Sequence, residues 1–356
     1  MFGIYRFILS LLVVAEHSGI NSSEHFDLIS PSYHIGASAV VGFYLLSGYV
    51  MAHSFRRNFG LNIKKTLPFY LDRFLRIYPT YIFLFISIMI FIVLAGQYRV
   101  DLNFNNIVAN ITIIPLNLLI FYSKGANFIL FPNNAVAYGL PFAMPNAPSL
   151  ALELQFYLVL PFILYYRKLL YAIYPISIII FVFAATGFIP WWHGYLLLPG
   201  TLYIFLSGAI LYEFKNRINM KMSGGYLACS SILLLVILIY ILYTNKYEKV
   251  GHIREVIIGF ELSLVIVYIL SKIKSKNYLD ILLGGLSYPI FLCANAAKLL
   301  PEYFFRNYNE LSIIQKNGYQ IISILLVALL AYYLIDYNTQ KYRKKIQYRL
   351  SKPKVE

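Results

Sequence analysis

Long apolar runs separated by short polar stretches make up the chain from its second residue to about position 337. A helix needs about 20 apolar residues to cross the hydrocarbon core of a bilayer, and ten of the runs approach this length. The chain is therefore predicted to be all-α, a polytopic membrane helical bundle of about ten transmembrane helices. The predicted spans are 2–20, 34–53, 77–95, 149–166, 170–187, 195–212, 226–243, 255–271, 281–300 and 318–337.

The topology depends on an eleventh, weaker run at 107–122, which is expected to be re-entrant or interfacial. It is short, it contains two asparagines, and Pro115 lies near its centre. With ten spans both termini lie on one side of the membrane, and basic residues indicate the cytoplasmic side. The loop 21–33 contains no Lys or Arg, whereas the segment 54–76 and the C-terminal stretch are rich in both. Both termini are therefore expected to be cytoplasmic.

The composition indicates a membrane protein and excludes a nucleic-acid-binding one. Hydrophobic residues make up 60% of the 356 residues and charged residues only 13%, which is too apolar for a soluble protein. The net charge of +15 comes from Lys and Arg that lie between the apolar runs. Cysteines and histidines show no metal-ligand spacing, so no metal site is expected. We expect a membrane domain, 1–340, that has the lipid bilayer as its partner, and a basic cytoplasmic tail, 341–356.

Arg6 and His17 share the first predicted span, and their spacing indicates a functional pair. Ionisable side chains are costly inside a bilayer and usually face a protein interior or a wet cavity. An offset of eleven residues is about three helical turns, so both side chains point the same way, about 16 Å apart along the axis. The alternative is that Arg6 reaches the cytoplasmic headgroups while His17 lies at the outer interface.

Two carboxylates are candidates to orient His17. Glu153 lies near the start of the span that follows the long outer segment, at a depth similar to that of His17. Glu16 is adjacent in sequence, but it projects about 80° away from the side that carries Arg6. A carboxylate beside an imidazole stabilises the charged ring, which suits a general base acting on a hydroxyl. Glu153 could instead form a structural pair between helices, and Glu16 could face the outer water.

Two further segments carry residues that suit ligand binding. Arg73 and Arg76 are three apart, hence neighbours on one helical face, and are expected at the inner membrane edge. Two guanidiniums so arranged suit phosphate, although a topological anchor is the commoner role, and Asp72 could simply pair with Arg76. Ser47 and Gly48 form a small-residue notch in the second span, which indicates helix packing or a backbone approach to a ligand.

Five segments carry motifs that occur together in one known family. YRFILSLLVVAEH holds Arg-x10-His, and GASAVVGFYLLSGYVM ends with Ser-Gly-aromatic. FYLDRFLRIYPTY holds Arg-x-x-Arg-x-x-Pro, and PSLALELQFYLVLP holds Ser-Leu-x-x-Glu-x-x-Phe-Tyr. LLGGLSYPIFL holds a late Gly-x-Ser-Tyr. In this order the motifs resemble those of acyltransferase family 3, the bacterial integral-membrane O-acyltransferases.

The resemblance implies transfer of an acyl group, usually acetyl, from acyl-CoA to a sugar hydroxyl by an inner-membrane O-acetyltransferase. The acceptor would be a surface polysaccharide, an O-antigen sugar of lipopolysaccharide or a lipid-linked glycan. The family's catalytic histidine falls on His17 and its motif glutamate on Glu153. Acetyl-CoA is expected as donor substrate, with no permanently bound cofactor, and the family's CoA-binding arginines fall on Arg6, Arg73 and Arg76. The expected substrate contacts are Glu16, Ser47 and Tyr157.

Three positions depart from the family pattern. Pro148 stands where the family commonly has tryptophan. Ala294 stands where a histidine often follows the Ser-Tyr motif, which puts a second catalytic histidine in doubt. The late Glu-Pro element appears as Asp336 without a following proline. The competing function is a transporter or flippase for a glycan or lipid-linked precursor, although no internal repeat of the kind found in many transporters is visible.

Overall fold

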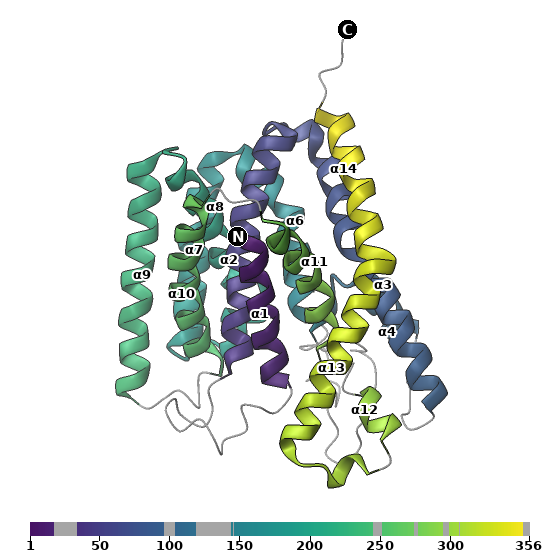
Figure 1. The fold of residues 1–356 in the computed structure, drawn as a ribbon. Coiled ribbons are helices and arrows are strands. Elements are labelled where there is room, and N and C mark those ends of the chain that lie inside the picture. The colour runs from purple at the N-terminus through teal and green to yellow at the C-terminus, as the bar shows by residue number, and fades with distance from the viewer. Residues whose placement is uncertain are drawn as a thin grey trace.

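The computed structural model describes residues 1–17, 34–95, 104–118, 144, 146–244, 251–273, 277–294, 299–305 and 307–351. Within these residues the chain is helical and has no strand, and each predicted span contains a helix (Figure 1). The longer helices are α1 (Phe2–His17), α2 (Ile35–Phe59), α3 (Thr66–Ala95), α6 (Ala147–Tyr165), α7 (Arg167–Ala185), α8 (Leu198–Lys215), α9 (Met220–Tyr243), α10 (Ile253–Lys272), α11 (Tyr278–Cys293), α13 (Ile313–Ala331) and α14 (Tyr337–Ser351). The shorter helices include α4 (Phe104–Thr112) and α12 (Leu299–Phe304).

Seven helical segments in the described part of the chain are long and apolar enough to cross a membrane. They contain α2, α3, α6, α7, α8, α9 and α13. The helices α1 and α11 have 16 residues each, about 24 Å at 1.5 Å per residue, which is shorter than a typical hydrocarbon core. The helix α10 is long enough but carries charged residues at both ends. The predicted polytopic helical bundle is thus confirmed.

The helix α2 lies at the centre of the bundle and packs against α1, α8 and α10. Glycines allow its close approach to α8. A Cβ at Gly48 would lie 1.8 Å from the carbonyl oxygen of Phe205, and a Cβ at Gly208 would lie 2.0 Å from that of Leu45. Small residues let two helix backbones come this close. Gly48 therefore serves helix packing, and its neighbour Ser47 is held at a fixed depth.

The helix α1 crosses α11 just as closely. A Cβ at Gly3 would lie 1.7 Å from the carbonyl oxygen of Asp280, and one at Gly284 would lie 2.7 Å from the Cα of Gly3. Asp280 also accepts a hydrogen bond of 2.9 Å from the backbone N–H of Ile4. This contact fixes the first turn of α1 and, with it, the position of Arg6.

The weak apolar run at 107–122 does not form one spanning helix in its described residues. The helix α4 has nine residues, about 14 Å, and it ends at Thr112. Ile113 then adopts a left-handed φ of 65°, just before Pro115. Residues 119–122 lie outside the described part of the chain.

The C-terminal helices form one long arm, in which α14 lies along α3 and α13 packs mainly against α11 (Figure 1). A π-helical turn, Tyr332–Asp336, joins α13 to α14. The helix α14 continues through position 340 to Ser351, so the first part of the expected tail, 341–351, is helical and continuous with the bundle. This places α14 beside the basic first half of α3.

Candidate active site in two adjoining cavities

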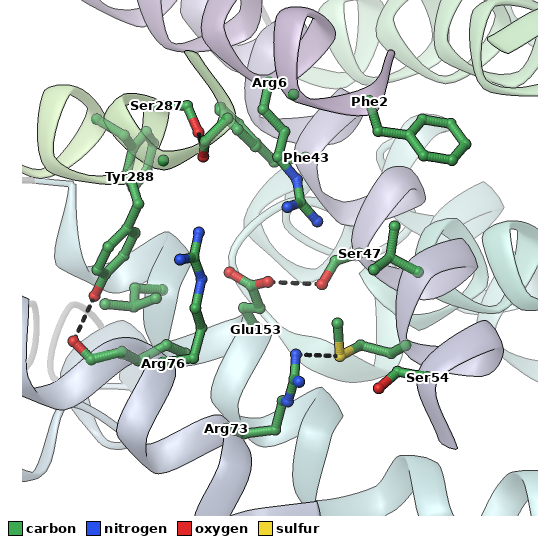
Figure 2. A pocket seen from close by; sticks show the side chains of 18 of the residues that line it. Phe2, Arg6, Phe43, Ser47, Ser54, Arg73, Arg76, Glu153, Ser287 and Tyr288 are labelled. Atoms are coloured by element: carbon green, nitrogen blue, oxygen red, sulfur yellow. Dashed lines mark hydrogen bonds between the residues drawn. The ribbon is translucent and has the colours of Figure 1, made fainter. Parts of the chain in front are cut away.

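A cavity of about 450 Å³ lies between α1, α2, α3, α6, α11 and α14, and we call it the arginine cavity (Figure 2). Figure 2 shows the side chains of Arg6, Arg73 and Arg76 gathered around Glu153. These residues come from helices far apart in sequence, which the crossings of α2 with its neighbours bring together. The charged residues that line the cavity are Arg6, Arg73, Arg76, Arg343, Glu153 and Asp280.

The helix α3 carries two of these arginines, Arg73 and Arg76, because it begins at Thr66, before the predicted span 77–95. Arg73 is paired with Asp72 and donates to the sulfur of Met51 at 3.1 Å. Arg76 lies 3.5 Å from both carboxylate oxygens of Asp336.

Aromatic and apolar contacts complete the wall beside these arginines. The Arg76 guanidinium lies over the ring of Tyr288, 5.9 Å from its centroid. The Tyr288 hydroxyl in turn donates to the carbonyl oxygen of Ile77 at 3.0 Å. The late Gly-x-Ser-Tyr motif therefore packs against the Arg-x-x-Arg motif, and the two motifs form one wall of the arginine cavity.

Arg6 differs from the other three arginines that line the arginine cavity, Arg73, Arg76 and Arg343, each of which pairs with an aspartate. Among the described residues, none forms a hydrogen bond or ion pair with its guanidinium. An unpaired guanidinium facing a cavity favours an anionic ligand, because burying a charge without a partner is costly.

Glu153 forms a compact polar group with two of the predicted substrate contacts, Ser47 and Tyr157. Its Oε1 accepts a hydrogen bond of 2.6 Å from the Ser47 hydroxyl and a further one from the Tyr157 hydroxyl. The two hydroxyls lie 3.1 Å apart. Ser47 comes from α2, while Glu153 and Tyr157 are one turn apart on α6.

A second cavity, of about 370 Å³, contains His17 at the end of α1, and we call it the histidine cavity. His17 Nε2 lies 3.0 Å from Asn146 Oδ1. Asn146 donates its Nδ2 to the carbonyl oxygen of Phe291 at 2.6 Å, which fixes the orientation of the amide. Because an oxygen then faces the imidazole, Nε2 carries the proton of the neutral ring and Nδ1 carries the lone pair.

Glu16 pairs with another histidine at the rim of the histidine cavity. Its Oε1 lies 2.7 Å from His34 Nδ1, and Oε2 accepts a 3.5 Å hydrogen bond from the backbone N–H of Gly36. The hydrogen bond to Glu16 raises the pKa of His34 above its usual value. The ring of His252 lies 4.7 Å from that of His34, and burial together with this neighbour lowers the pKa of His252.

The two cavities adjoin at three residues that line both, Val40, Tyr44 and Ser149. The Tyr44 hydroxyl donates to the carbonyl oxygen of Ser149 at 3.4 Å. Its ring stacks on Phe205 with centroids 4.5 Å apart. Tyr44 therefore stands between the arginine cavity and His17, and a long hydrogen bond is all that ties its hydroxyl to α6.

The structure groups the predicted site residues into two sets. Six of them line the arginine cavity, namely Arg6, Ser47, Arg73, Arg76, Glu153 and Tyr157. The other two, Glu16 and His17, line the histidine cavity. Glu153 and His17, expected at similar depth, thus face different cavities.

Sequence reasoning missed three residues of the site, Tyr44, Asn146 and Arg343. Asn146 lies two residues before PSL, so its place at the start of a helix was a usable signal. Arg343 was assigned to the tail. No group of three or more His, Cys, Asp or Glu suited to a metal ion occurs among the described residues.

Comparison with known proteins adds a family match. A family model described as an acyltransferase domain matches residues 4–337. An uncharacterized protein from Aquifex aeolicus (strain VF5) is 32% identical over 212 residues, which are 59% of this chain and 92% of that protein. No solved structure matches the chain. The matched residues include the first-helix motif with Arg6 and His17 and the motif with Arg73 and Arg76. They end before Gln340 and Arg343.

Proposed function

This chain belongs to the acyltransferase-domain family and is a multi-pass membrane acyltransferase, and we propose that it moves an acyl group from acyl-CoA to a glycan hydroxyl. Acetyl is the simplest donor group. The proposed acceptor is a sugar of a cell-surface polysaccharide, an O-antigen or a lipid-linked glycan, and the proposed site is the bacterial inner membrane. One observation carries the proposal: the cavity that gathers Arg6, Arg73 and Arg76 adjoins the cavity that contains His17.

The arginine cavity suits the phosphates of acyl-CoA. Guanidiniums bind phosphate through paired, charge-assisted hydrogen bonds. Arg6 and His17 are about 16 Å apart along α1, a distance that an extended pantetheine arm can cover. The arm passes Glu153, Ser47 and Tyr157 and reaches the junction at Tyr44.

The histidine cavity suits activation of the acceptor. The lone pair on His17 Nδ1 takes the proton of the sugar hydroxyl as its oxygen attacks the thioester carbonyl carbon. The C–S bond then breaks, the acyl group stays on the sugar oxygen, and the departing CoA sulfur takes a proton from the imidazolium. The contact between Asn146 and Nε2 keeps the ring in the required tautomer.

The placement of Glu153 favours a role on the donor side. It shares a cavity with the three arginines, and its hydrogen bonds go to Ser47 and Tyr157. We therefore assign Glu153 to the passage of the acyl arm, and we assign the orientation of His17 to Asn146.

The direct test uses protein purified in detergent, radiolabelled acetyl-CoA and candidate glycans. Label should move to one glycan, and mass spectrometry of surface glycans from cells with and without the protein should identify the missing acyl group. His17→Ala should abolish the transfer while the protein remains in the membrane. Absence of label transfer, together with glycan movement in sealed vesicles, would establish a transporter instead.

A further inference from the structure

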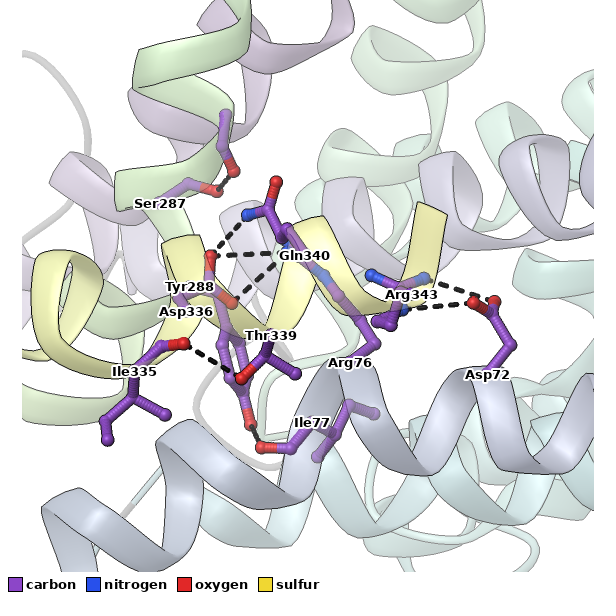
Figure 3. Close-up of polar contacts among 11 residues, drawn as sticks. Asp72, Arg76, Ile77, Ser287, Tyr288, Ile335, Asp336, Thr339, Gln340 and Arg343 are labelled. Atoms are coloured by element: carbon purple, nitrogen blue, oxygen red, sulfur yellow. Dashed lines mark hydrogen bonds and ion pairs between the residues drawn. The ribbon is translucent and has the colours of Figure 1, made fainter. Parts of the chain in front are cut away.

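The C-terminal helix α14 directs polar side chains into the arginine cavity. Gln340 and Arg343 line the cavity, and Asp336 lies on the same side of the arm (Figure 3). The spacings of four and three residues place the three on one helical face. Gln340 donates to Asp336, and Asp336 accepts from Arg76. The helix is thus attached to α3 at the cavity mouth.

Arg343 makes the most specific of these contacts. Its Nε donates to Asp72 Oδ1 at 3.0 Å and its Nη2 to Asp72 Oδ2 at 3.1 Å. This is a two-point pairing of a guanidinium with a carboxylate across 271 residues of sequence. Asp72 is 2% exposed and Arg343 is mostly covered, with 12% of its side chain exposed.

Asp72 is shared between two guanidiniums, since Arg73 also pairs with it. Arg73 retains a buried Nε without a hydrogen-bond partner, although only 9% of its side chain is exposed. A single carboxylate thus pairs with two buried cations and can neutralise only one of them, and the Nε–H of Arg73 has no hydrogen-bond partner. Such a cluster is poised to accept a second anion, because each buried charge and N–H gains from pairing.

Arg343 lies outside the part of the chain that the family model matches, which ends at residue 337. The family's arginine motifs account for Arg6, Arg73 and Arg76, and they leave Arg343 unassigned. Its guanidinium is nevertheless in the same cavity as the other three.

We propose that Arg343 is a fourth phosphate-binding guanidinium of the donor site, with Asp72 as the counter-ion that a donor phosphate displaces. This rests on the proposed function, because it takes acyl-CoA as the ligand. In the structure Asp72 pairs with Arg73 and Arg343. When a phosphate enters, its oxygens take the inward N–H groups of both arginines, and α14 becomes part of the bound site rather than a tail.

The test is equilibrium binding of acetyl-CoA to the full-length protein in detergent, measured by calorimetry. Arg343→Ala should weaken binding by about ten-fold or more, the range of a hydrogen bond to a charged group. Arg343→Lys should give a smaller loss, because a lysine keeps the charge but not the two-point geometry. Lys345→Ala, which removes an exposed cation two residues further along α14, should bind as the wild type does.

The counter-ion role predicts an opposite effect at position 72. Asp72→Asn removes the competing charge, so acetyl-CoA should bind several-fold more tightly. Weaker binding by an Asp72→Asn protein that elutes as a single species on gel filtration would overturn the counter-ion role. If this variant does not fold, the Arg343 variants decide the assignment.

A donor fragment separates phosphate binding from a general effect on the fold. Pantetheine, which lacks the phosphates, should bind Arg343→Ala and the wild type equally. An equal loss for pantetheine and acetyl-CoA, or no loss for acetyl-CoA, would overturn the assignment of Arg343. A wild-type protein that binds no acyl-CoA would instead refute the proposed function, so the two failures are distinguishable.

Discussion

The two cavities of this membrane acyltransferase differ in the kind of polar chemistry that they hold. The arginine cavity has four guanidiniums, and the carboxylates Asp72 and Asp336 pair with three of them. The histidine cavity contains imidazoles held by an amide and by a carboxylate. Fixed charges bind anions, whereas imidazoles move protons near neutral pH. The difference indicates a division of labour between holding a donor and activating an acceptor.

Tyr44 lies where the two cavities meet, because its side chain lines both of them. In the proposed reaction, a donor held by the arginines brings its acyl carbon past this ring to an acceptor beside His17. The predictions below test whether each cavity does one part of the reaction.

The largest expected effect is on the proton acceptor. His17→Ala should lower kcat for acyl transfer by about 100-fold or more, the usual contribution of a general base. Binding of acetyl-CoA should be unchanged, because His17 faces the other cavity. The matched control is His53→Ala, an exposed histidine at the far end of α2, which should keep full activity. Normal transfer by His17→Ala would remove the histidine cavity from the chemistry.

The next effect falls on donor binding. Arg76→Lys should raise the KM for acetyl-CoA by about ten-fold and leave kcat nearly unchanged, because lysine keeps the charge opposite Asp336 but loses the paired N–H geometry. Arg57→Ala removes an exposed cation near the end of α2 and serves as control. Steady-state kinetics at varied acetyl-CoA concentration measures the effects on KM and kcat separately. A fall in kcat with an unchanged KM would place Arg76 in the chemical step and would contradict a role limited to donor binding.

The pH dependence of kcat in Asn146 variants tests whether Asn146 acts through His17. Asn146→Asp keeps an oxygen facing His17 Nε2 but adds a charge, which stabilises the imidazolium. The acid limb of the kcat profile should therefore move to higher pH, since His17 then stays protonated longer. Asn146→Ala should lower kcat by about ten-fold without moving the KM for the donor. An unshifted profile in Asn146→Asp would mean that Asn146 does not act through His17.

The smallest effect concerns the pair of His34 with Glu16. The pKa of His34 is raised in the folded protein, so its protonated form stabilises the fold at pH below the unfolded value and this contribution is lost as pH rises through the raised value. The pair is partly exposed and is expected to contribute less than about 1 kcal/mol. The melting temperatures of the wild type and of Glu16→Gln, measured in detergent, should differ at pH 6 and be equal at pH 9. A difference that persists at pH 9 would mean that Glu16 acts through other contacts.

The sequence predicted the helices well because apolar runs determine membrane spans locally. The family resemblance implied a shared site for Arg6, Arg73 and Arg76, and the three line one cavity. It missed the contacts that join remote segments. His17 meets Asn146 across 129 residues, and Arg343 meets Asp72 across 271. No local pattern encodes such pairings, which depend on how the helices cross.

The helix α3 extends further toward the N-terminus than the predicted span 77–95. Charges between 64 and 76 suggested a loop, and the span was placed at 77–95. The helix begins at Thr66, and Asp72 and Arg76 on its first half pair with Arg343 and Asp336 of the C-terminal arm. The segment 341–356 was predicted to be a tail because it is rich in Lys and Arg, but α14 carries Arg343 into the cavity.

The measurement that tests the central claim most directly is transfer across inside-out membrane vesicles. Radiolabelled acetyl-CoA, which cannot cross the membrane, is added outside, where the arginine cavity is predicted to open. Label should appear on glycan inside the vesicles containing wild-type protein, and it should be absent with His17→Ala although donor binding persists. Label confined to glycan on the outside would contradict a reaction that passes from the arginine cavity to the histidine cavity.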